Sequence, residues 1–260
     1  MSGHSKWSKI KRAKGAQDAK RGKIFTKLNK EITIAVKEGG NPDPESNPRL
    51  RLAIQNAKGS NMPKDNIERA IKKAAGEGGE AYHETTYEGY APGGIAIFVE
   101  TMSDNLNRTV ASVRSIFSKG GGNLGTNGSL TFLFERKGVF VLDGSAINGM
   151  DPEELEMDLI DGGAEEVEFV SAEDEDAPND IEVTTAFEDF GTMQSKLEEL
   201  KIEPKTATTP RIPNNTESLD ISTAKQVYHL IEKFEDDDDV QNVYHNLELS
   251  DELMAALEED

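Results

Sequence analysis

The chain has 260 residues, contains no cysteine, and carries 49 Asp and Glu against 29 Lys and Arg, a formal net charge of −20. The lack of cysteine excludes disulfides, thiolate metal sites and cysteine nucleophiles, and it favours a reducing compartment, for which the cytoplasm is our expectation. The length allows two or three domains with cores of their own, whereas the longest uninterrupted apolar stretch, residues 95–99, is far too short to span a membrane.

Apolar residues at helical spacing, with residues that start and stop helices, predict three helices in the first 76 residues. They fall at residues 23–38, 47–59 and 63–76. Asn47 is placed to cap the second helix, with Pro48 at its first position. Asp65 and Glu68 are spaced like a capping pair for the third helix. We expect a small helical domain over residues 1–76.

After a glycine-rich linker at residues 76–80, the composition becomes acidic and the pattern alternates between strands and helices. We expect strands at 82–90, 95–102 and 129–135, with a helix that starts at Asp104 between the second and the third. A helix at 222–234 and a strand at 240–247 follow much later and have no partner nearby. Because a lone helix and strand cannot bury their apolar faces, we expect them to return to this first sheet.

The intervening residues are expected to form a second α+β domain. The predicted order is strand 139–142, helix 152–160, strand 166–170, strand 181–187, helix 192–200 and strand 205–209. This β-α-β-β-α-β order is typical of ferredoxin-like domains. The predicted fold is therefore α+β, with the helical domain 1–76, one α+β domain formed by residues 80–135 with 205–247, and a ferredoxin-like domain at 136–204 inserted in it.

Charge divides the chain at the same place as the predicted first boundary. Through Gly76 there are 18 Lys and Arg against 7 Asp and Glu, a net +11, while the remainder holds 11 against 42, a net −31. A cationic block of this kind usually contacts phosphate, and an acidic body discourages indiscriminate adsorption to nucleic acid. A lysine-rich solvated tail is the alternative.

One glycine-rich run and one acidic run could each form a binding site. Residues 119–128 contain G-x-G-x-x-G at Gly120, Gly122 and Gly125, but a helix precedes them and a strand follows, the reverse of the dinucleotide-binding arrangement. We expect a loop that ends the helix, with backbone contact to a phosphate as the alternative. The acidic run 235–239 lacks the spaced ligands of a calcium loop and predicts a solvated turn.

No pattern of residues predicts catalysis. The four histidines are scattered without the spacing of a zinc site, and the signatures of P-loop, kinase and α/β-hydrolase enzymes are missing from the sequence. We expect no enzyme activity, no metal and no cofactor. A metal-dependent enzyme with an acidic cleft is the alternative from another class.

An aromatic residue lies within the basic N-terminal block. Trp7, the only tryptophan, stands between Lys6 and Lys9, with His4 just before them. An exposed indole among cations can stack on a base or ribose while its neighbours neutralise phosphates. The alternative is that Trp7 packs onto the helical domain.

Several segments resemble a known family. They are MSGHSKW (1–7), QDAKRGKIFTKL (17–28), NPRLR (47–51), NMPK (61–64), YEGYAPGG (87–94), DNLNRT (104–109) and GGNLG (121–125). They are similar to the signature segments of the YebC/PmpR family, which includes the mitochondrial translational activator of cytochrome oxidase. The resemblance implies three domains around an open acidic concavity, and a protein described either as a cytoplasmic DNA-binding transcriptional regulator or as a ribosome-associated factor for proline-rich stretches.

We therefore predict a non-enzymatic nucleic-acid-binding regulator of gene expression, with a translation factor that binds ribosomal RNA as the alternative. The predicted partners are nucleic acid at the N-terminal domain and a protein on the acidic domains, without a membrane. Residues that match the family's N-terminal pattern and are cationic or stacking here form most of the predicted contact set: His4, Lys6, Trp7, Lys9, Lys11, Arg12, Lys14, Lys20, Arg21, Lys23 and Lys27. Arg49, Arg51 and Lys64 of the later helices complete it.

Overall fold

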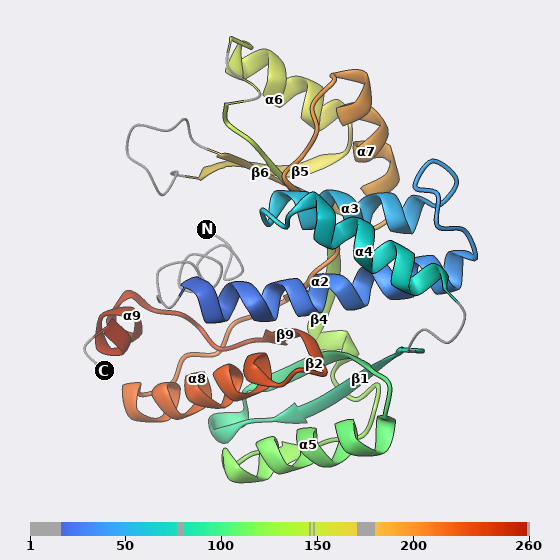
Figure 1. The fold of residues 1–260 in the computed structure, drawn as a ribbon. Coiled ribbons are helices and arrows are strands. Elements are labelled where there is room, and N and C mark those ends of the chain that lie inside the picture. Colours follow the sequence, from blue (N-terminus) through green and yellow to red (C-terminus); the bar gives the residue numbers. More distant parts are fainter. Residues whose placement is uncertain (1–16, 77–80, 146, 148, 171–179, 259–260) are drawn as a thin grey trace. The chain divides into compact units, whose positions relative to one another are not determined.

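The computed structural model describes residues 17–76, 81–145, 147, 149–170 and 180–258 (Figure 1). They belong to two compact units. Unit 1 takes its residues from Met1–Lys30, Gly78–Glu135 and Ile212–Asp260, and unit 2 from Glu31–Glu77 and Arg136–Arg211. Within the described ranges, no helix is both long enough and apolar enough to cross a membrane.

Unit 1 is built on an antiparallel sheet of four strands in the order β3-β1-β2-β9. The strands are β1 (His83–Tyr90), β2 (Ala96–Ser103), β3 (Asn123–Leu124) and β9 (Val240–His245). β1 and β2 pair from His83 opposite Ser103 to Tyr90 opposite Ala96. β9 pairs with the other edge of β2, so the prediction that the last strand returns to the first sheet is confirmed.

Helices α5 (Leu106–Lys119) and α8 (Ile221–Asp236) cover one face of this sheet (Figure 1). Their buried side chains, including Phe117 and Phe234, form one core with the inward-facing residues of β2, and the two rings meet edge to face at 4.8 Å. A further helix, α9 (Asp251–Glu258), adds Leu253 to this core. Helix α9 lies beyond the elements predicted from the sequence pattern, which end at residue 247.

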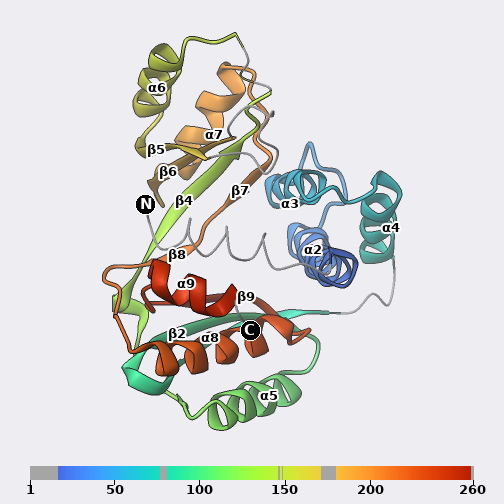
Figure 2. The ribbon, with the colours of Figure 1, turned by 90° about the vertical axis from the view of Figure 1, so that its left-hand side faces the viewer.

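Unit 2 contains the second sheet, in the order β5-β6-β4-β7, with β8 also paired to β4. The strands are β4 (Phe134–Leu142), β5 (Ala164–Val170), β6 (Asp180–Ala186), β7 (Thr206–Thr208) and β8 (Arg211–Pro213). Helices α6 (Pro152–Asp161) and α7 (Phe190–Glu199) pack on one face of the sheet (Figures 1 and 2). The elements from β4 to β7 follow one another in the β-α-β-β-α-β order that the sequence pattern predicted.

The prediction of a separate strand at residues 129–135 is wrong. Residues 131–133 form a short 3-10 helix, and β4 begins at Phe134 and continues through Gly138 to Leu142. Gly138 lies within this strand, where the lack of a side chain allows close packing. A Cβ at this position would lie 2.4 Å from the hydroxyl oxygen of Thr185. The predicted strand at residues 139–142 is thus the second half of one longer strand, β4.

The three N-terminal helices are α2 (Gln17–Gly39), α3 (Pro48–Gly59) and α4 (Lys64–Ala75). Asn47 caps α3 as predicted, because its side-chain oxygen accepts a hydrogen bond from the backbone N–H of Leu50 at 3.0 Å. The predicted cap of α4 is wrong: the helix begins at Lys64 after Pro63, without a side-chain cap, and Asp65 lies inside its first turn.

Helix α3 is attached to the edge strand β7 within unit 2, and Figure 2 shows the two elements side by side. The Asn56 side chain pairs with both backbone groups of Ala207, at 2.9 Å to its carbonyl oxygen and 2.8 Å to its N–H. Gly59 allows the close approach, since a Cβ there would lie 1.7 Å from the carbonyl oxygen of Lys205. α3 thereby covers this edge of the sheet. An uncovered edge strand could pair with a strand of another chain.

Candidate nucleic-acid interface

The predicted contact residues are distributed over undescribed and described segments. The residues before α2 lie outside the described residues: His4, Lys6, Trp7, Lys9, Lys11, Arg12 and Lys14. Lys20 is within α2, but its side chain also falls outside the description. Arg21, Lys23 and Lys27 follow in the part of α2 that belongs to unit 1, whereas α3 and α4 belong to unit 2. The contact assignments and the predicted domain boundaries stay predictions.

Three lysines on one side of α2 contact a single turn of unit 1. Lys23, Lys27 and Lys30 are spaced i, i+4 and i+7, which places them on one helix face. Lys23 Nζ pairs with Asp236 Oδ1 at 2.6 Å. Lys27 Nζ donates to the carbonyl oxygens of Glu235 and Gln241 at 3.4 and 3.2 Å. We call residues 235–239 the acidic turn; it comprises the last two residues of α8 and the three residues that lead to β9.

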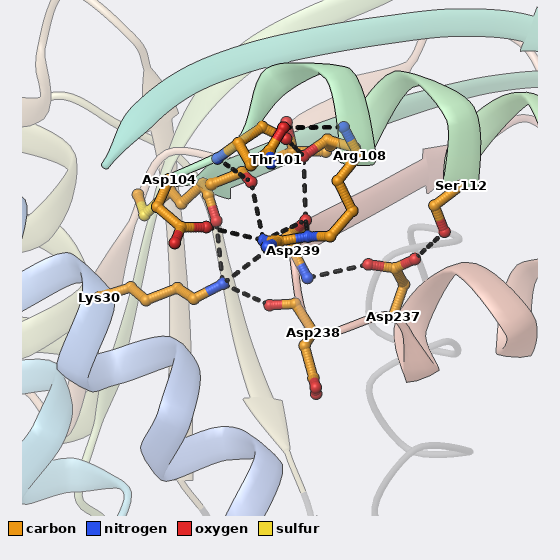
Figure 3. Close-up of polar contacts among 12 residues, drawn as sticks. Lys30, Thr101, Asp104, Arg108, Ser112, Asp237, Asp238 and Asp239 are labelled. Carbon is orange, nitrogen blue, oxygen red and sulfur yellow. Dashed lines mark hydrogen bonds and ion pairs between the residues drawn. The ribbon is translucent and has the colours of Figure 1, made fainter. Parts of the chain in front are cut away.

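Lys30 makes the most buried of these contacts (Figure 3). Its ammonium donates to the carbonyl oxygens of Met102 at 2.9 Å and Asp238 at 2.6 Å, and it lies 3.5 Å from Asp239 Oδ1. The side chains of Lys30 and Asp239 are only 9% and 8% exposed. A buried ammonium is tolerated where its donors are satisfied in this way, so Lys30 anchors α2 to unit 1.

Asp239 is the centre of a polar cluster, and the prediction of a uniformly solvated acidic turn is therefore wrong for this residue. Arg108 of α5 donates to both Asp239 carboxylate oxygens at 2.9 to 3.1 Å, and the Thr109 hydroxyl donates at 2.9 Å. Burial alone would raise the pKa of Asp239, but hydrogen bonds from Arg108, Thr109 and Ser103 outweigh it and hold the pKa below its ordinary value. Its charge is thus maintained inside the fold.

A pocket of about 590 Å³ opens beside this cluster within unit 1. Its lining combines two cations with acidic and hydroxyl groups: Lys30, Tyr82, Asp104, Arg108, Ser112 and the aspartates 236–239. The carboxylates of Asp104 and Asp239 both accept hydrogen bonds from Arg108, and the carboxylate of Asp237 accepts one from the Ser112 hydroxyl. Within the described ranges, no three His, Cys, Asp or Glu residues are placed to hold a metal ion.

The glycine-rich loop after α5 is already occupied by a carboxylate of the chain itself. Gly120 ends α5, as predicted, and Gly121 takes the left-handed conformation with φ +77°. The buried Glu88 carboxylate accepts hydrogen bonds from the backbone N–H of Gly128, at 2.7 Å, and of Leu130. Within the glycine motif itself, the N–H groups of Gly122 and Gly125 donate to the backbone carbonyl oxygens of Phe117 and Glu88 at 2.8 and 2.7 Å. These donors are therefore already used inside the chain, which favours a structural loop over the alternative of a phosphate site.

The predicted cations of α3 and α4 have local partners. Arg49 pairs with Glu38, and Arg51 donates to the carbonyl oxygens of Pro44 and Glu45 at 3.2 and 3.0 Å. Lys64 lies 3.5 Å from Glu68 on the exposed face of α4. These contacts are at the surface, where ion pairs are weak and exchange readily with other ligands.

Two family models match this chain almost end to end. The model described as the TACO1/YebC protein N-terminal domain matches residues 5–77, and the model of the TACO1/YebC second and third domain matches residues 82–247. The chain belongs to the TACO1/YebC family. The boundary between the two matches falls at the linker that the composition predicted.

Relatives within the TACO1/YebC family are similar over their whole length. A protein of Rubrobacter xylanophilus named "Probable transcriptional regulatory protein" is 51% identical over 259 residues, with 99% of each chain covered. One of the same name from Syntrophus aciditrophicus is 52% identical over 260 residues, again with 99% coverage of both. A crystal structure of a conserved hypothetical protein from Aquifex aeolicus has a TM-score of 0.76 and 43% identity, and the match covers 91% of this chain and 94% of that one.

The structure of this TACO1/YebC chain also shows two candidate contact residues outside the set predicted from the sequence. Arg69 and Lys72 of α4 are exposed and have no ion-pair partner within the described residues. They are spaced i, i+3 and so share one face of the helix. A helical projection of α4 could have identified both residues, because they are cations on one face of a predicted helix.

Proposed function

We propose that this chain is a non-enzymatic regulator of gene expression that binds nucleic acid through its basic N-terminal region. The observation that carries the proposal is the segregation of charge, net +11 through Gly76 against net −31 in the remainder. A polyanion gains favourable contacts and counterion release only at the first of these regions. The exposed Arg21, Arg69 and Lys72, without ion-pair partners among the described residues, supply cations for phosphate contacts.

We propose duplex DNA as the target, since the relatives named above are called transcriptional regulatory proteins. Ribosomal RNA is the second candidate, and the sequence around Trp7 favours it. An indole between lysines can stack on an unpaired base, which structured RNA offers and an intact duplex does not. A protein partner on the acidic domains stays a separate prediction.

Crosslinking in cells, followed by sequencing of the DNA and the RNA that are recovered with the full chain, tests the target. Enrichment of duplex DNA fragments over the input is the expected result. Recovery of ribosomal RNA without enriched DNA would replace the DNA proposal by the translation-factor alternative. Recovery of neither pool above an uncrosslinked control would overturn nucleic-acid binding itself.

A further inference from the structure

The contacts between α2 and the acidic turn are graded in exposure. The ion pair of Lys23 with Asp236 is open to solvent, with 43% and 60% of the two side chains exposed. Lys27 is half-buried, and its ammonium donates to two backbone carbonyl oxygens. Lys30 is buried and fully engaged. The first lysine can therefore exchange its partner without unfolding, and the last cannot.

We propose that the acidic turn and nucleic acid compete for Lys23 and Lys27, so that the turn opposes nucleic-acid binding by the start of α2. The inference rests on the proposed function, because it assigns an internal competitor to the same interface. It goes beyond that function in giving Asp236 a defined role, which is to occupy a phosphate-binding lysine until a polyanion displaces it.

The chemistry of the two ligands is matched. A carboxylate oxygen and a phosphate oxygen both accept charge-assisted hydrogen bonds from an ammonium group. At the position of Lys23 the carboxylate of Asp236 is 2.6 Å from Nζ, so a phosphate can take the same donor only after that contact breaks. Asp236 and Asp238 are also exposed, and their charges repel a phosphate within the screening distance of about 8–10 Å.

Lys30 defines the limit of the exchange. Its three acceptors come from β2 and from the acidic turn, and two of them are backbone carbonyls. Removing this ammonium from the fold would leave Asp239 buried with one cation fewer, which is costly. α2 therefore stays attached at Lys30 while Lys23 and Lys27 change partner.

The test compares two neutralisations in the same turn of the full chain. Asp236→Asn removes the partner of Lys23. Asp238→Asn removes an equal charge from a side chain that has no ion pair among the described residues, since Asp238 contacts Lys30 through its backbone carbonyl oxygen. Affinity for a random-sequence DNA duplex is measured by fluorescence anisotropy at fixed low salt. We expect Asp236→Asn to bind roughly two- to fivefold more tightly, the equivalent of one exposed ion pair, and Asp238→Asn to gain less.

A double-mutant cycle identifies the lysine through which the turn acts. In the background of Lys23→Gln, the gain from Asp236→Asn should disappear, because the competed donor is gone. Equal gains for the two aspartate variants, or a gain that persists without Lys23, would overturn the competition and leave only general repulsion. If the wild-type chain binds the duplex and Asp236→Asn binds no better, the competition is overturned while the proposed nucleic-acid binding stands. If no variant binds DNA or a structured RNA, the proposed function fails with it.

Discussion

Asp239 shows how differently neighbouring residues of one acidic run behave. In the sequence it is the last of five consecutive acidic residues that carry no distinguishing signal. In the structure Asp236 and Asp238 are exposed, whereas Asp239 is buried against Lys30 and Arg108. The difference could not be predicted from the sequence, because both cations are more than 100 residues away along the chain.

The substitution Asp239→Ala is expected to lower the free energy of unfolding by about 3 kcal/mol, because it leaves the buried Lys30 ammonium without its carboxylate partner. Asp238→Ala is the matched control, with an expected change within about 0.5 kcal/mol at an exposed site. Urea denaturation followed by circular dichroism measures both. Equal effects of the two substitutions would contradict the buried cluster.

The same residue gives a pH dependence with a defined sign. The pKa of Asp239 is lowered by folding from 3.8, so the folded state favours its ionised form. Its contribution is complete above the unfolded value and is lost as the pH falls through the lower folded value. The stability difference between wild type and Asp239→Ala should therefore narrow below about pH 4. Denaturation curves measured from neutral to acidic pH check this, and a gap that widens on acidification would refute it.

Glycines show at the element scale what a local pattern predicts and what it does not. Gly39 and Gly120 end helices at the places the sequence predicted. Gly138, which falls between the predicted strands 129–135 and 139–142, instead lies inside β4, where it faces Thr185 of the neighbouring strand. The order of strands and helices in the second sheet followed from periodicity, but close contacts between elements depend on tertiary packing, which periodicity does not contain.

Gly59→Ala tests the attachment of α3 to β7. An added Cβ would lie 1.7 Å from the Lys205 carbonyl oxygen, so the helix must shift, at a cost of about 1–3 kcal/mol typical of overpacking. Gly191→Ala in α7 is the control, because a Cβ there meets nothing within 4 Å. We expect the control to be as stable as wild type or slightly more stable. Thermal unfolding of both variants measures the two effects. A Gly59→Ala variant with the melting temperature of the wild type would contradict the close packing of α3 against β7.

For the whole molecule, charge was the most informative property of the sequence. It separated a cationic N-terminal region from an acidic remainder, and the two family matches divide the chain at the same linker. The return of β9 to the first sheet was also predictable, since the last helix and strand had no local partner. The engagement of Lys23, Lys27 and Lys30 by the acidic turn could not be predicted, because those contacts join segments more than 200 residues apart.

The most direct test of the account is the salt dependence of nucleic-acid binding by the full chain and by a chain without residues 1–21. Neutralising Z phosphates of a duplex gives a slope of log K against log salt of about −0.9Z. We predict a steep slope for the full chain and a much shallower slope for the truncated chain, which keeps only the later cations such as Lys23 and Lys27. No change is expected when the exposed Arg114 and Lys119 of α5 are replaced by Gln as a control. A truncated chain that keeps both the affinity and the slope would contradict the assignment of binding to the basic N-terminal region.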